Sequence, residues 1–105
     1  MAHKKRRGDR RDGRWIRDID GFHAVMMNLI PNRCEAEVYS KEQFEVVKLL
    51  EMVDRRNREN PELTTKAFHV FVAAIAKTIW HREFLNRFVA GRRMYQRNGL
   101  SFSFV

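Results

Sequence analysis

The side chains that could take part in a reaction are few and widely spaced in this chain of 105 residues. His69 stands at the edge of an apolar pattern with helical spacing, where an imidazole could act as a base or as a structural hydrogen-bond partner. Asn86 and Arg87 follow that pattern, at a position where a ligand channel could pass. In the alternative interpretation, Asn86 satisfies a turn and Arg87 pairs with an acidic neighbour. These three residues are the candidates for a substrate channel.

Carboxylates and metal ligands give weaker signals. Glu35 and Glu37 are two residues apart and would share one face of a strand, as a catalytic carboxylate pair could. Solvent-facing charge is the simpler interpretation, because no neighbouring feature would prepare either group as an acid or base. One cysteine, Cys34, excludes an internal disulfide and a cysteine cluster for zinc, and His81 with Glu83 is too sparse for a metal site. Phosphate-binding loops of the types G-x-x-x-x-G-K-[ST] and G-x-G-x-x-G are absent.

Most of the net charge of +8 belongs to the N-terminal part of the chain. Residues 1–17 hold eight Lys and Arg against two Asp, so we expect a basic flexible arm there and a folded domain over residues 18–105. Such an arm attracts phosphates weakly and without sequence preference, and its removal should leave the fold intact. Trp15 is the only aromatic residue in it, which weakens a nucleic-acid hypothesis. The candidate residues of this arm are Lys4, Lys5, Arg6, Arg7, Arg10 and Arg11.

Periodic apolar residues predict the elements after the arm. Residues 22–30 form a short amphipathic helix with Asp20 as the N-cap, and Pro31 ends it. Residues 34–38 alternate as a half-buried strand. Residues 40–46 are ambiguous, because Ser40 and Gln43 could open a helix, whereas an extended strand could also continue until a helix begins near Val47.

The later elements are one strong helix and several strands. Residues 64–82, capped by Thr64 or Thr65, predict a central buried helix, with small alanines on one side for packing against a sheet. Strands follow over residues 85–89 and 92–97, and Asn98-Gly99 signals a hairpin before a strand with Leu100, Phe102 and Phe104 on its buried face. This order predicts a mixed α/β layer structure. Because domains rarely end on an apolar strand, we expect this one to continue beyond Val105.

The longest uninterrupted apolar run, residues 70–76, is too short to cross a membrane, and no apolar segment follows the basic start as in a secretory signal. Together with the single cysteine this predicts a cytoplasmic location and no membrane partner.

Residues 31–105 resemble one family. The similarity lies in the stretch from Glu59 to Ile79, then in Leu85-Asn86-Arg87-Phe88, Gly91-Arg92-Arg93, Tyr95 and Leu100-Ser-Phe-Ser-Phe-Val. These residues resemble the catalytic domain shared by the acyltransferase subunits of 2-oxo acid dehydrogenase complexes and by chloramphenicol acetyltransferase, and most closely its stand-alone members. The resemblance implies an α+β two-layer sandwich with a mixed sheet, of which this chain is the N-terminal part. It also favours an extended strand up to about Val46.

The resemblance implies transfer of an acyl group between a carrier thiol, such as coenzyme A or dihydrolipoamide, and an acceptor. The thioester is then a substrate, no cofactor is covalently bound, and the complete domain is a homotrimer. In that family a histidine within His-x-x-x-Asp-Gly is the general base. None of His3, His23, His69 and His81 has an Asp-Gly at that distance, so no catalytic residue is carried over. The alternatives are a catalytically silent family member that acts as a scaffold, and a nucleic-acid-associated protein that uses the arm.

Overall fold

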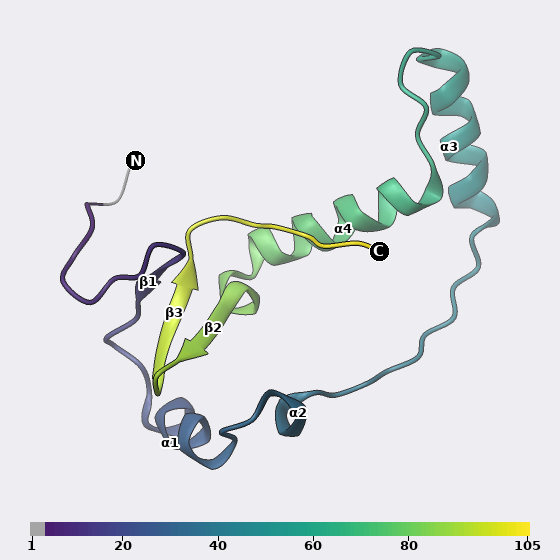
Figure 1. Ribbon diagram of the computed structural model, residues 1–105. Coiled ribbons are helices and arrows are strands. Elements are labelled where there is room, and N and C mark those ends of the chain that lie inside the picture. Colours follow the sequence, from purple (N-terminus) through teal and green to yellow (C-terminus); the bar gives the residue numbers. More distant parts are fainter. Residues whose placement is uncertain (1–3) are drawn as a thin grey trace. The chain divides into compact units, whose positions relative to one another are not determined.

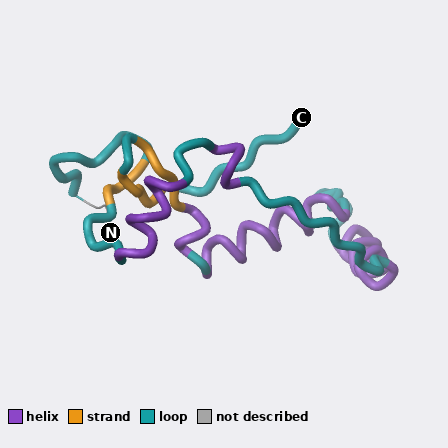
Figure 2. The backbone as a smooth tube through the Cα atoms, turned by 90° about the horizontal axis from the view of Figure 1, so that it is seen from below, coloured by secondary structure: helices purple, strands orange, loops and turns teal. Residues whose placement is uncertain are grey.

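The computed structural model describes residues 4–105; Met1, Ala2 and His3 lie outside the described residues. The described residues form a mixed α+β structure with four α-helices, one short 3-10 helix and a small three-stranded antiparallel sheet. They divide into two compact units. The sheet unit contains the N-terminal part up to Val38 together with His81–Val105, and the helix unit is Tyr39–Trp80. All strands belong to the sheet unit (Figure 2).

The sheet consists of β1 (Gly13–Trp15), β2 (Arg87–Ala90) and β3 (Arg93–Arg97) in the order β1-β3-β2 (Figure 1). Both pairings are antiparallel, so the predicted mixed sheet is wrong for the described residues. Gly91 and Arg92 join β2 to β3 with φ values of 56° and 57°. Two successive positive φ values make the mirror-image turn whose twist suits a tight hairpin.

The turn that Gly91 predicts between the two strands is confirmed, whereas the further hairpin predicted at Asn98-Gly99 is absent. Asn98 instead holds the arm: its backbone N–H donates to the Asp12 carbonyl at 3.2 Å. Residues 98–105 form no strand, because both edges of the adjacent β3 are already occupied by β1 and β2. The predicted strand through Phe102 is thus also wrong.

The basic arm is not separate from the sheet. Gly13, Arg14 and Trp15 pair with Arg97, Gln96 and Tyr95 of β3. The expectation of an arm outside the fold is therefore wrong for Gly13–Trp15, because these residues complete the second edge of β3. The same pairing overturns the expectation that residues 1–17 can be removed without loss of structure.

The first helix, α1 (Gly21–Leu29), is confirmed. The Asp20 carboxylate accepts the backbone N–H of His23 at 2.8 Å, which is the N-cap interaction that the sequence predicts. The C-cap is Ile30, directly before Pro31.

The strand predicted for residues 34–38 is wrong, because Arg33–Ala36 form the one-turn helix α2. Local polar contacts favour this turn: Asn32 accepts the Glu35 N–H through its carbonyl at 3.2 Å, and Arg33 pairs with Glu37 at 3.0 Å. The extended strand up to Val46 that the family resemblance favoured is absent as well. Helix α3 (Val47–Glu59) begins where the alternative interpretation placed it, with Val46 rather than Ser40 as its N-cap.

Helix α4 (Ala67–His81) lies within the predicted range, but it begins two residues after Thr65. It has no buried side chain, and Phe68 and Ile75 are 54% and 50% exposed, so the predicted central buried helix is wrong. A periodic pattern reports that a helix has an apolar face, but not that another element covers it. The short 3-10 helix η1 (Glu83–Asn86) then leads into β2.

Candidate functional site

Three aromatic residues from the three strands lie in one row across the sheet. Trp15 of β1 and Phe88 of β2 are each paired with Tyr95 of β3. Residues directly opposite one another in an antiparallel pair project from the same face. The rings of Phe88 and Tyr95 are stacked, with centroids 5.4 Å apart and an angle of 20° between the planes. We call this side of the sheet the ring face.

Arginine side chains cover the ring face. The guanidinium carbon of Arg93 lies 4.3 Å from the centroid of the Trp15 ring and that of Arg97 lies 4.7 Å from the centroid of Phe88. Arg93, Tyr95 and Arg97 alternate along β3 and therefore share one face. Two arginines of the arm approach the same rings: Arg17 is 4.7 Å from Trp15, and Arg10 is 5.8 Å from both Phe88 and Tyr95. These distances are within the range of cation–π attraction.

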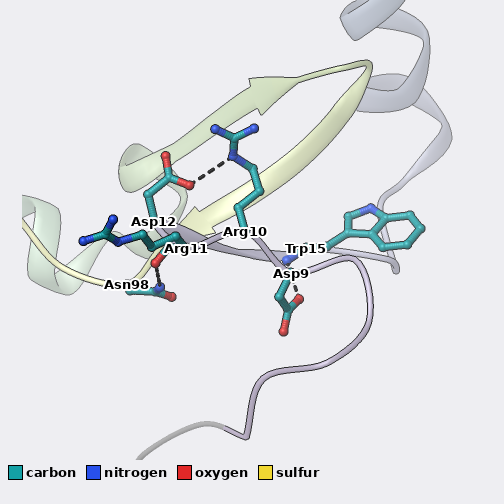
Figure 3. A network of polar contacts seen from close by, with 6 residues as sticks. All are labelled: Asp9, Arg10, Arg11, Asp12, Trp15 and Asn98. Carbon is teal, nitrogen blue, oxygen red and sulfur yellow. Dashed lines mark hydrogen bonds and ion pairs between the residues drawn. The ribbon is translucent and has the colours of Figure 1, made fainter.

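The arm is held against the sheet by a network of polar contacts (Figure 3). The Asp9 carboxylate accepts the backbone N–H of Trp15 at 3.0 Å, and Asn98 Nδ2 donates to the Arg11 carbonyl at 3.1 Å. Arg10 Nε donates to Asp12 at 3.0 Å, and this hydrogen bond lowers the pKa of the Asp12 carboxyl below its ordinary value of 3.8. The guanidinium of Arg10 is thereby directed toward the rings.

The predicted arm residues have different positions in this network. Lys4 and Lys5 are exposed, and Arg6 donates its backbone N–H to Asp9. The Arg7 carbonyl accepts a hydrogen bond of 2.6 Å from the guanidinium of Arg17. Only Arg10, of the six arm candidates, has its guanidinium over the ring face. The side chains of the other five are exposed.

Most of the net positive charge lies in the sheet unit. It carries fourteen Lys and Arg, of which twelve are Arg, against seven Asp and Glu. The helix unit carries seven Lys and Arg against six Asp and Glu. The excess of arginine is thus not confined to the arm, because five arginines of the sheet unit lie after residue 80. Sequence reasoning missed Arg93, Arg97, Phe88 and Tyr95 as members of a site. The alternation Arg-x-Tyr-x-Arg in residues 93–97 was the available signal, since it predicts one shared face.

His69 lines a groove of about 540 Å³ between α3 and α4 within the helix unit, together with Met52, Val53, Arg56, Thr65 and Val70. Its Nδ1 accepts the backbone N–H of Lys66 at 3.0 Å, so Nδ1 is the unprotonated nitrogen of the neutral ring and Nε2 carries the hydrogen. Lys66 directly precedes α4, and His69 is the third residue of the helix. This contact is one half of a capping box, with histidine in the place of Glu or Gln; the Lys66 side chain has no acceptor for the other half. The arrangement gives His69 a structural role at the helix start.

Asn86 and Arg87 lie in the sheet unit and have protein partners as well. Asn86 Nδ2 donates to the Gly99 carbonyl at 3.2 Å, which agrees with the interpretation of a turn residue. Arg87 Nε donates to Gln96 at 3.2 Å, so its partner is an amide and not an acidic neighbour. Arg87 also lines a cleft of about 210 Å³ with His23 and Met94. Because His69 belongs to the other unit, the three channel candidates form no site within either unit, and their role in a channel stays a prediction.

Other site types have little support. No group of three or more His, Cys, Asp or Glu side chains among residues 4–105 is arranged to hold a metal ion. Glu35 and Glu37 lie in and directly after α2, where Glu37 pairs with Arg33. Cys34 is an exposed thiol. Within the described part of the chain, no helix combines the length and the apolar character that a membrane span requires.

Comparisons of this chain with family models, with curated proteins and with solved structures find no match.

Proposed function

We propose that this chain forms the N-terminal part of an acyltransferase domain that moves an acyl group between a carrier thiol, such as coenzyme A or dihydrolipoamide, and an acceptor. One observation supports the proposal: the residues that resemble this family follow one another through consecutive elements, from the end of α3 through α4 and η1 to the β2–β3 hairpin. A resemblance spread over several elements is more specific than one short motif.

The chain contributes no general base in this proposal. Acyl transfer to a thiol or hydroxyl needs a group that removes its proton, and a preorganised donor for the developing oxyanion. The imidazole of His69 accepts the Lys66 N–H through Nδ1, which leaves no second lone pair on its ring for a substrate proton. The part that carries His-x-x-x-Asp-Gly would supply the base, and the complete domain would be a homotrimer in the cytoplasm.

The test is the reading frame after the codon for Val105. We expect it to encode His-x-x-x-Asp-Gly, and we expect the extended protein to release thiol from acetyl-coenzyme A in the presence of chloramphenicol or dihydrolipoamide. Replacing the histidine of that motif by alanine should abolish the release. A frame without the motif, together with an extended protein that transfers no acyl group, would reject the enzyme and favour a catalytically silent scaffold.

A further inference from the structure

The ring face combines fixed arginines with aromatic rings in a unit that has an excess of positive charge. Trp15 and Phe88 are half-buried, whereas Tyr95 is only 5% exposed beneath its neighbours. The guanidinium carbons of Arg93 and Arg97 lie within cation–π distance of the Trp15 and Phe88 rings, and both arginine side chains are exposed. Neither side chain donates a hydrogen bond to a residue among 4–105, and Arg97 interacts through its charge with Asp12, whose pKa it helps to lower. Their N–H groups are therefore available to an external acceptor.

We propose that the ring face binds single-stranded nucleic acid. Arg93 and Arg97 would donate to the phosphates, and the outer faces of the guanidinium planes that lie over Trp15 and Phe88 would contact unpaired bases. This inference does not depend on acyl transfer: Phe88, Arg93 and Tyr95 are among the residues that resemble the acyltransferase family, but the acyltransferase proposal gives none of them a role.

The chemistry of the arginines favours a phosphate ligand. The planar guanidinium donates two parallel hydrogen bonds to a phosphate, which a lysine ammonium does not. Cation–π contacts with Trp15 and Phe88 have already restricted the arginine side chains, so that less conformational entropy is lost when a ligand binds. Twelve of the fourteen cationic side chains in the sheet unit are arginines, and this composition fits phosphate recognition better than general solubility.

The aromatic row favours a single strand over a duplex. Bases lie on aromatic rings or guanidinium planes only where they are unstacked from their neighbours, as in a single strand. Trp15 and Phe88 are on the two edge strands, with Tyr95 between them, so a strand that crosses the sheet would meet a guanidinium supported by a ring on either side. In the sequence, Trp15 is the only aromatic residue of the arm. The pairing of β1 with β3 brings Tyr95, and with it Phe88, to the same face of the sheet.

The experiment uses the full chain with Trp80→Phe, which leaves Trp15 as the only tryptophan. Trp80 is 79% exposed on α4, so its replacement leaves the ring face unchanged. We expect an oligothymidine to quench Trp15 fluorescence and to bind with an affinity that falls steeply between about 50 and 200 mM salt. Replacing Arg93 and Arg97 by glutamine should weaken binding about tenfold or more, and should lower the slope of log affinity against log salt by about 1.4.

The matched control is the double variant Arg14→Gln with Arg87→Gln. It removes the same charge from β1 and β2, and both residues pair with Gln96, on the opposite side of the sheet from the ring face. We expect it to weaken binding much less. The charge-preserving variant Arg93→Lys with Arg97→Lys, with its fold verified by circular dichroism, should also lose affinity. An equal loss in the control, full affinity of the lysine variant, equal quenching by a duplex or by heparin, or no binding at all would each overturn the proposal.

Discussion

The ring of Phe88 lies directly over Gly13. A Cβ atom on Gly13 would be 2.7 Å from Phe88 Cε1 and 3.0 Å from the Gln96 carbonyl oxygen, so even one methyl group has no room. Gly13 is buried, although it belongs to a segment that composition marks as a solvated arm. This contact ties the arm to the hairpin.

Gly13→Ala should therefore destabilise the sheet unit by about 1–3 kcal/mol, the usual cost of forcing a methyl group into an occupied space. Gly99→Ala is the matched control, because a Cβ there meets no atom within 4 Å. The free energy of unfolding, measured in urea through Trp15 fluorescence in the Trp80→Phe background, compares the two. Equal stability of the two variants would show that β1 does not pack under Phe88.

The side-chain amide of Asn57, in α3, makes two hydrogen bonds to the backbone of Thr65 in the segment that connects α3 to α4. Oδ1 accepts the Thr65 N–H and Nδ2 donates to the Thr65 carbonyl, each at 2.8 Å. Asn57→Ala removes both hydrogen bonds and should cost about 1–3 kcal/mol. Amide hydrogen exchange at Thr65 should become faster, whereas it should not change in the exposed neighbour variant Arg58→Ala. Unchanged exchange at Thr65 in Asn57→Ala would contradict the assignment.

Acid should weaken the start of α1. The backbone N–H of His23, and then its side chain, lower the pKa of Asp20 below its ordinary value of 3.8. The folded chain thus binds this proton less readily than the unfolded chain does, so the stabilisation is present above about pH 3.8 and disappears as the pH falls through the lowered value. Chemical shifts of Ala24 during an acid titration should report the loss. In Asp20→Asn, whose amide caps but does not titrate, this transition should be absent; its persistence would assign the effect to another group.

If the proposed function holds, the chain alone should transfer no acetyl group from acetyl-coenzyme A to dihydrolipoamide or chloramphenicol above the uncatalysed rate, because the proposal places the general base in His-x-x-x-Asp-Gly, a motif that residues 1–105 do not contain. His69→Glu should preserve the capping contact with Lys66, whereas His69→Ala should reduce the helicity of α4 in circular dichroism. A thiol-release assay decides the activity. Turnover that is lost in both His69 variants would show that the imidazole is catalytic.

The segment 100–105 exposes apolar side chains. Phe102 and Phe104 stack on one another, with centroids 6.2 Å apart, and are 38% and 56% exposed. We expect the isolated chain to self-associate through this segment, since exposed aromatic area favours association. Replacing both by serine should reduce self-association in sedimentation velocity, and replacing Ser101 and Ser103 by alanine should not. A monomer at high concentration before any substitution would contradict this expectation.

Local sequence signals predicted the elements well where the cause is local. Asp20 and Pro31 mark the two ends of α1, and the periodic residues of α3 and α4 require helices whatever surrounds them. The prediction of a strand at residues 34–38 was wrong. Apolar and polar residues alternate there over only five positions, and local hydrogen bonds and an ion pair favour a single helical turn instead. The prediction of a hairpin at Asn98-Gly99 was also wrong. Two residues that favour a tight turn make a hairpin only if the segment after them can pair with a free strand edge.

The sequence by itself determined the positions of the main helices, the two hairpin strands and the excess of arginine. Only the tertiary structure decided that Trp15 lies beside Tyr95, and that Arg93 and Arg97 cover the rings of residues on two other strands. The physical reason is that periodicity records which way a side chain points relative to its own backbone. The partner of a strand depends instead on which edge remains open after the chain has folded, and β1 takes the edge of β3 that the hairpin leaves unpaired.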